Sequence, residues 1–214
     1  MSSEKRIGAM RWPWVWLAAF FALGTASENS WAAKQRGFST VVIDAGHGGH
    51  DLGGIRSNII LEKGVALDVA LRLQKHLKAA GLHTVLTRSS DVFVTLGRRV
   101  AISNSQSNAI FVSIHFNSAY RVGARGIETF HCSPAGAKLA SRIQCNAMRT
   151  TPGDNRGIKR ASFYVLRKNR HTAVLIEGGF LTNAQDAALA NRKDYREKLA
   201  FQIASAILEY RRSL

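Results

Sequence analysis

The chain has 214 residues, of which 46% are hydrophobic, and it is long enough for one packed domain but too short for two. The first 32 residues account for only one unit of the net charge of +16, so the remaining chain carries the basic excess. This excess indicates a polyanionic partner, either an anionic membrane surface or an acidic cell-wall polymer. Because the basic residues are scattered and no aromatic residues are interleaved among them, they argue against nucleic acid.

Residues 1–32 have the layout of a secretory signal peptide. Basic residues precede an apolar run at 12–23, and small and polar residues follow as far as Ala32. The run is shorter than the roughly 20 residues that span a bilayer core, so we expect cleavage after Ala26 or Ala32 and an exported domain at 33–214. The alternative is an uncleaved anchor with four interfacial tryptophans, and only then would we expect contact with a membrane.

The hydrophobic patterns predict alternating strands and helices. Residues Leu61, Val65, Val69, Leu73 and Leu77 recur every fourth position and predict an amphipathic helix that ends at Gly81. We expect helices at 61–80, 96–103, 134–149 and 194–212, and strands at 41–43, 82–86, 109–115, 126–132, 163–166 and 173–176. In the second helix we expect Arg98 and Arg99 to point outward. The pattern indicates a single α/β domain with a largely parallel, mixed and twisted sheet of about six strands and helices on both faces.

The two cysteines, Cys132 and Cys145, are expected to be free and mostly buried. Cys132 ends a predicted strand, whereas Cys145 lies about ten residues into the following helix, roughly 15 Å along its axis. A disulfide requires Cα atoms within about 7 Å of each other.

Ionisable residues follow three of the predicted strands directly. His47 follows the first strand in a glycine-rich loop, His115 ends a central strand, and Glu177 ends the strand before the last helix. Parallel strands would bring these groups to one edge of the sheet, and Glu62 joins them from the first turn of the first helix. Two imidazoles and two carboxylates suit a catalytic Zn²⁺ site, which has three protein ligands and an open position for water. A fourth residue must move the proton, and spacing alone leaves open which glutamate does so.

Seven motifs occur in order over residues 40–212: Ile43–Gly49, Glu62–Lys63, Leu86–Arg88, Ser113–Asn117, Arg156–Lys159, Phe163–Arg167 and Ile176–Asn183. Together they resemble the zinc-dependent N-acetylmuramoyl-L-alanine amidases of the amidase-3 family. The resemblance implies one Zn²⁺ per chain with His47, Glu62 and His115 as ligands, and Glu177 as the catalytic carboxylate. It also implies peptidoglycan as the substrate, cleaved between N-acetylmuramic acid and L-alanine, and a location in the periplasm or cell wall.

Two other functions remain open, a non-catalytic binder of anionic cell-wall polymer and a zinc carboxypeptidase acting on wall peptides. Some relatives insert a blocking helix in the segment that corresponds to 115–177, which is too short for one here. We therefore expect an open site that needs no activator.

Several residues near these motifs have two interpretations. Asp44 is either an acceptor that orients a ligand imidazole or a strand-end cap, and Arg156, Lys159 and Arg167 contact either stem-peptide carboxylates or solvent. His50 and Asp51 are expected to be bystanders. The glycines around His47 are expected to let a bulky substrate approach.

Overall fold

The computed structural model describes residues 37–54, 60–120, 123–149 and 153–214, within a unit that spans Gln35–Leu214. The predicted signal segment at 1–32 lies outside the described residues. No helix in the described ranges has both the length and the apolar character needed to cross a bilayer.

The strands are β1 (Thr40–Ala45), β2 (His83–Leu86), β3 (Ala109–Asn117), β4 (Ile127–His131), β5 (Asn155–Arg160) and β6 (Thr172–Phe180); the helices are α1 (Glu62–Ala79), α2 (Leu96–Asn104), α3 (Pro134–Ala147), α4 (Tyr164–Arg167), α5 (Ala184–Asn191) and α6 (Lys193–Arg212).

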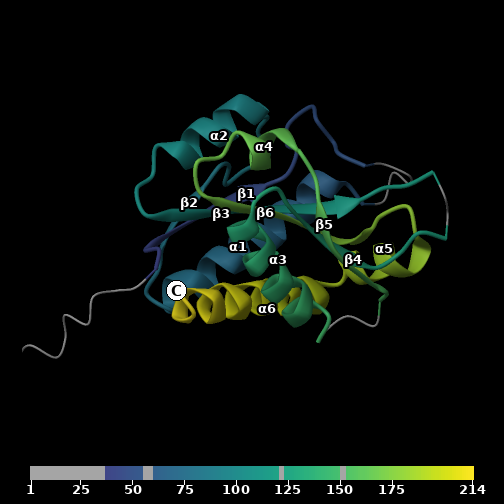
Figure 1. The fold of residues 1–214 in the computed structure, drawn as a ribbon. Helices are drawn as coiled ribbons and strands as arrows, with labels where there is room; N and C mark the ends of the chain where they lie inside the picture. The colour runs from purple at the N-terminus through teal and green to yellow at the C-terminus, as the bar shows by residue number, and fades with distance from the viewer. Residues whose placement is uncertain (1–36, 55–59, 121–122, 150–152) are drawn as a thin grey trace, which may run out of the picture. The chain divides into compact units, whose positions relative to one another are not determined.

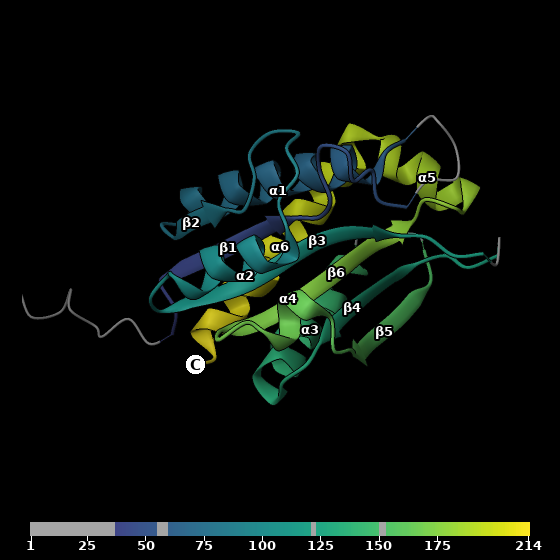
Figure 2. The ribbon, with the colours of Figure 1, turned by 90° about the horizontal axis from the view of Figure 1, so that it is seen from above.

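The six strands form one sheet in the order β2-β1-β3-β6-β4-β5. Strands β2, β1, β3 and β6 are parallel, β4 runs antiparallel to β6, and β5 is parallel to β4. Helices α1, α3 and α6 cover one face, while the shorter α2 and α4 lie on the other (Figure 1, Figure 2). The predicted single α/β domain with a mixed sheet and helices on both faces is therefore confirmed.

The two faces of the sheet bury different side chains because the residues of a strand alternate in direction. On β1, Val41 and Ile43 pack with α1 and α6 in the larger core, while Val42 packs with α2 and α4 in the smaller one. Among the described residues the smaller core includes eight buried hydrophobic side chains, far fewer than the larger core, so it covers just part of its face. The uncovered part of that face, near the carboxyl ends of β1, β3 and β6, holds the polar side chains that the sequence singled out.

Some local predictions were wrong. Residues 163–166 do not form a strand, because the backbone amides of Leu166 and Arg167 both donate to the carbonyl of Phe163 and close a helical turn. A run of four apolar residues cannot distinguish these two structures. Strand β5 was missed because its charged sequence lacks an apolar pattern, which is common in edge strands. Helix α5 was also missed, although the Asn183 side chain caps its N-terminus.

The predictions for Arg99 and for the burial of Cys145 also need correction. Arg99 is only 3% exposed and points toward β1, whereas the neighbouring Arg98 is exposed as expected. Helix α2 has few apolar residues, so its periodicity did not reveal which side faces inward. Both cysteines are free, as predicted, but Cys132 is half-buried and Cys145 is exposed on α3.

Candidate functional site

Strand register places three ionisable side chains on the same face of the sheet. His115 on β3 is opposite Glu177 on β6, and Glu177 is in turn opposite Glu128 on β4. Directly paired residues point to the same side of a sheet, and here that side is the one partly covered by α2 and α4. The parallel β3–β6 pairing thus brings together two of the residues singled out in the sequence.

His47, Glu62 and His115 form a compact cluster whose ligand atoms all lie within 4.8 Å of one another. Glu62 Oε1 is 3.0 Å from His47 Nε2 and 2.8 Å from His115 Nδ1. Burial raises the pKa of Glu62, but hydrogen bonds from both imidazoles outweigh this effect and hold it well below its usual range. Two imidazole nitrogens and a charged carboxylate, converging from three separate segments, are a donor set that fits Zn²⁺.

Asp51 positions His47, contrary to the prediction that it is a bystander. Its Oδ1 lies 2.8 Å from His47 Nδ1 and also accepts a hydrogen bond from the backbone amide of Gly53 at 3.2 Å. With Nδ1 bound to Asp51, Nε2 of His47 faces the cluster, an arrangement typical of metal-ligating histidines. Burial lowers the pKa of His47, but hydrogen bonds to Glu62 and Asp51 reverse this and raise it above its ordinary value. His50 has no such role and instead stacks on Phe93, with ring centroids 4.1 Å apart.

The glycines near His47 make room for the ligand side chains themselves. A Cβ on Gly46 would lie 2.4 Å from Cε1 of His115, and a Cβ on Gly53 would lie 2.5 Å from Oε2 of Glu62. Protein side chains therefore occupy the space beside both glycines, and close approach of substrate along this loop stays a prediction. The backbone here is also unusual, since His47 adopts a left-handed conformation with φ 58°.

Asp44 anchors a buried arginine rather than orienting an imidazole. Arg99 Nη1 donates to Asp44 Oδ1 at 2.7 Å, and the hydroxyls of Thr87 and Ser113 donate to its two oxygens at 2.6 and 2.7 Å. Burial raises the pKa of Asp44, but the charge of Arg99 and these hydrogen bonds hold it below its usual range. The carboxylate is thus ionised and fixed inside the protein, where it neutralises Arg99.

Arg99 and Arg88 together fix the backbone that leads into His47. Arg99 donates to the carbonyls of Ala45 at 2.5 Å and His47 at 2.7 Å. Arg88 donates to the carbonyls of Ala45 at 3.0 Å and Gly46 at 2.6 Å. Three consecutive carbonyls, starting at the last residue of β1, therefore accept hydrogen bonds from buried guanidinium groups. Arg88 had been noted only as part of a motif, and Arg99 had been assigned to the surface.

Glu177 differs from the other carboxylates because part of it has no partner. Its Oε2 is buried without a hydrogen bond to any of the residues that the structure describes. Burial and the negative charges of Glu62 and Glu128 raise the pKa of Glu177 well above its ordinary value. An unpaired buried carboxyl group is costly for folding, so its retention beside the cluster is typical of a functional group.

Glu128 itself binds two cations that the sequence had linked either to substrate or to solvent. Lys159 Nζ lies 2.5 Å and Arg156 Nε 2.7 Å from its Oε2, and Asn117 donates to its Oε1 at 2.8 Å. Arg156 and Lys159 are therefore held by a buried carboxylate while remaining partly exposed, and Arg167 is exposed on α4. Glu128 was missed in the sequence because it lies within a strand and has no motif.

A cavity of about 610 Å³ is lined by His47, Glu62, His115 and Glu177. Apolar residues of α2, α4 and the segments that precede them also line it. All four candidate site residues thus border one space large enough for a small organic group.

Comparisons with known proteins agree with this architecture. A family model described as N-acetylmuramoyl-L-alanine amidase matches residues 41–209. The chain is 37% identical over 205 residues to the uncharacterized protein YqiI of Bacillus subtilis, covering 94% of this chain and 98% of YqiI. It is also 37% identical over 177 residues to the N-acetylmuramoyl-L-alanine amidase LytC of the same organism, covering 81% of this chain but only 36% of LytC.

The fold is also similar to solved structures. The catalytic domain of CwlV, an N-acetylmuramoyl-L-alanine amidase from Bacillus (Paenibacillus) polymyxa var. colistinus, superposes with a TM-score of 0.78 at 36% identity, covering 81% of this chain and 98% of that domain. The amidase AmiC2 of Nostoc punctiforme gives a TM-score of 0.77 at 37% identity, with 80% and 96% covered.

Proposed function

The chain belongs to the Amidase_3 family of N-acetylmuramoyl-L-alanine amidases, and from this premise we propose that it is a zinc-dependent peptidoglycan hydrolase. It cleaves the amide bond between N-acetylmuramic acid and the L-alanine of the stem peptide. The observation that carries the proposal is the convergence of His47, Glu62 and His115 in one cavity with Glu177, whose Oε2 is buried without a hydrogen bond to any described residue.

His47, Glu62 and His115 would hold one Zn²⁺ per chain. When bound, the ion supplies Lewis-acid chemistry, lowering the pKa of water and polarising the scissile carbonyl. The protein fixes the ligands in advance: Asp51 sets the orientation of His47, and Arg88 and Arg99 hold the backbone around it. Such support keeps the ligands in the geometry that the reaction requires.

Glu177 is the proton-transfer group of the proposed reaction. Its unpaired oxygen is free to accept a proton from the attacking water and to deliver it to the departing alanine amine. The raised pKa of Glu177 makes its conjugate acid a weaker donor but its carboxylate a stronger base, which suits a group that takes up a proton near neutral pH. Its position opposite His115 in the sheet places it beside the ligand cluster.

The decisive experiment is digestion of purified sacculi with zinc-loaded protein, followed by mass spectrometry of the new ends. An amidase releases free lactyl carboxylates and alanine amines. A carboxypeptidase would release shortened peptides, and a non-catalytic binder would release nothing, so either result would contradict the proposal. A chelated sample of the same protein is the matched control.

The same preparation tests whether an activator is needed. The segment from His115 to Glu177 contributes β4, α3, β5 and α4 to the domain. Because the cavity is already present beside these elements, we expect purified protein to cleave sacculi without any added partner. Activity that appears only after a second protein is added would contradict this part of the proposal.

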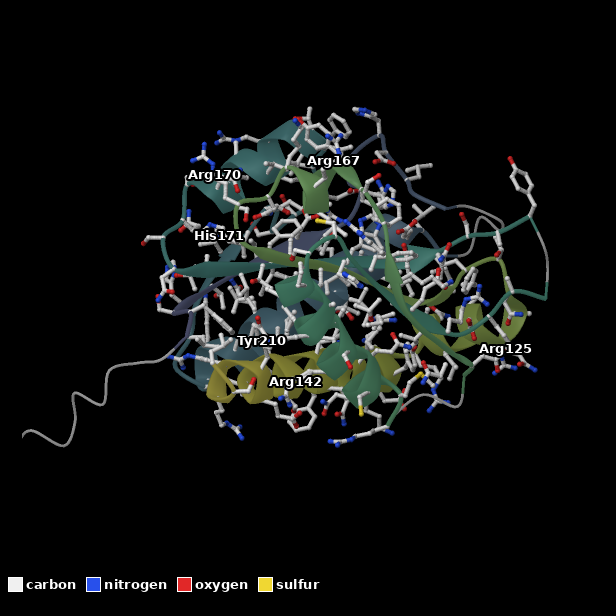
Figure 3. The ribbon with its side chains drawn as sticks, in the orientation of Figure 1. Arg125, Arg142, Arg167, Arg170, His171 and Tyr210 are labelled. Atoms are coloured by element: carbon white, nitrogen blue, oxygen red, sulfur yellow. The ribbon has the colours of Figure 1, made fainter. Side chains whose placement is uncertain are left out.

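Export to the periplasm or cell wall and attraction to anionic wall polymers complete the proposed function. No acidic residue occurs at 92–127 or 155–176, the segments that include α2 and α4. Arg98, Arg167, Lys168 and Arg170 are all exposed there, and Arg167 and Arg170 lie on the side of the sheet away from Arg142 and Tyr210 (Figure 3). Binding to walls that retain their anionic polymers should therefore weaken with added salt more than binding to stripped walls.

A further inference from the structure

Exposed apolar side chains gather at the mouth of the cavity. Phe93 and Leu96, at the start of α2, are 44% and 55% exposed, and Phe163 and Tyr164, at the start of α4, are each 41% exposed. All four also line the cavity. We call these four residues the apolar lip. Contiguous exposed apolar groups beside a cavity usually mark a binding surface rather than chance exposure.

The lip is built from two segments that are distant in sequence and held firmly in place. Phe93 stacks on His50, with ring centroids 4.1 Å apart, and Phe163 packs edge-on against Phe130 at 5.0 Å. The segments are joined farther along, where Asn104 of α2 donates from Nδ2 to the carbonyl of Lys168 at 3.1 Å. The lip is therefore a pre-formed surface, and a ligand that binds it loses little affinity to ordering of the protein.

The chemistry of the lip restricts what it can bind. Residues 92–97 and 161–166 contain no charged side chain, while Ser162 and Tyr164 offer exposed hydroxyl groups. A stem peptide carries carboxylates and amines, which find no counter-charge within these two segments. A pyranose ring has an apolar C–H face that stacks on aromatic side chains and hydroxyls that bond to polar groups at their edges.

We propose that the apolar lip is a sugar subsite that binds a pyranose ring of the glycan strand. This inference rests on the proposed function, because the amide cleaved there joins a sugar to a peptide and one lactyl group separates the sugar from the reacting carbonyl. The sugar must consequently lie at the border of the cavity, where the lip is. The stem peptide then leaves toward other walls of the cavity, away from the uncharged apolar lip.

The test uses peptide-free glycan strands and binding measured by calorimetry. Peptide-free glycan contains no amide that the protein could cleave, so the unsubstituted chain serves as the parent, and each variant must retain its thermal unfolding midpoint. The combined variant Leu96→Ala/Tyr164→Ala should bind the glycan about tenfold more weakly, the loss expected for a stacked ring and its neighbour. Tyr164→Phe keeps the aromatic face and should lose much less affinity.

Phe201→Ala is the matched control, because Phe201 is 52% exposed on α6 and does not line the cavity. It should leave glycan affinity unchanged. Equal affinity in the parent and the combined lip variant would overturn the proposal. The proposal would also be overturned if the combined lip variant kept its glycan affinity but lost binding of free stem peptide or of anionic phospholipid vesicles.

These outcomes are separable from those of the proposed function. If sacculi yield no free lactyl carboxylates, the amidase activity is refuted, yet lip-dependent binding of peptide-free glycan would still support the subsite. If sacculi are cleaved and the lip variants bind glycan normally, only the subsite is refuted.

Discussion

Replacing Arg99 with alanine should destabilise the domain severely, although an arginine on a short surface helix would ordinarily tolerate the change. The substitution leaves Asp44, only 1% exposed, as a buried charge without its cation. It also removes the donors to the carbonyls of Ala45, His47 and Val94. Removing one partner of a buried ion pair costs about 3–5 kcal/mol, a large part of the roughly 5–15 kcal/mol that stabilises a typical domain.

Urea unfolding followed by circular dichroism would measure this effect. A loss of about 4 kcal/mol with a slope of about 2 kcal/mol per molar lowers the unfolding midpoint by about 2 M. Arg98→Ala is the matched control on the same helix, and because Arg98 is exposed its effect should stay within about 0.5 kcal/mol. If the free energies of unfolding of the two variants lie within about 1 kcal/mol of each other, the buried Arg99–Asp44 network contributes little to the stability of the domain. Should Arg99→Ala fail to fold, Arg99→Lys, which keeps the charge but loses the planar fork, should still fall below the control.

Further predictions concern the candidate site. Glu177→Gln should retain zinc but lower turnover by roughly 10²–10⁴-fold, and turnover near that of the parent would place the base elsewhere. His115→Ala should lose the metal, as measured by elemental analysis after gel filtration, and a full complement of zinc would exclude His115 as a ligand. Asp51→Asn should weaken zinc binding about 10–100-fold in a chelator competition, because His47 loses its orienting acceptor. Zinc affinity should fall as the pH is lowered, because zinc needs neutral imidazole and the raised pKa of His47 lets protons compete at a higher pH than usual. Calorimetry in buffers of different ionisation enthalpy should detect proton release on binding at neutral pH, and its absence would contradict this linkage.

The features of the fold that depend on strong local patterns were predictable from the sequence. Strands β1, β3 and β6 are buried on both faces, so their sequences are nearly continuous apolar runs. Such runs predict strands of a parallel sheet. Once these strands were placed, the ends of β3 and β6 had to meet, and the structure does pair His115 with Glu177. The side chain of Glu62 reaches the same region because α1 begins directly after the loop that contains His47.

The features that depend on contacts between distant segments were not predictable. Arg99 faces inward because it binds Asp44, which lies 55 residues away in the sequence. The pattern of apolar residues within helix α2 does not indicate such a distant partner. Glu128 is buried because Arg156 and Lys159 on β5 approach it, and β5 itself has no apolar pattern. Asp51 lies only four residues after His47, which is a weak indication in the sequence that the two interact. The hydrogen bond that orients His47 can be identified only when the loop conformation is known.

The order of strands in the sheet has a consequence for how the proposed centre comes into being. His47, His115 and Glu177 are brought together by the β1–β3 and β3–β6 pairings, each of which joins residues some 60 or more positions apart. Pairings between such distant segments form slowly because a long loop must close first. An extended or partly folded chain therefore has no metal-binding centre and no place to hold its substrate. In the proposed site, zinc binding requires the β1–β3 pairing that brings His47 and His115 together, so metal uptake during refolding would report when this pairing has formed.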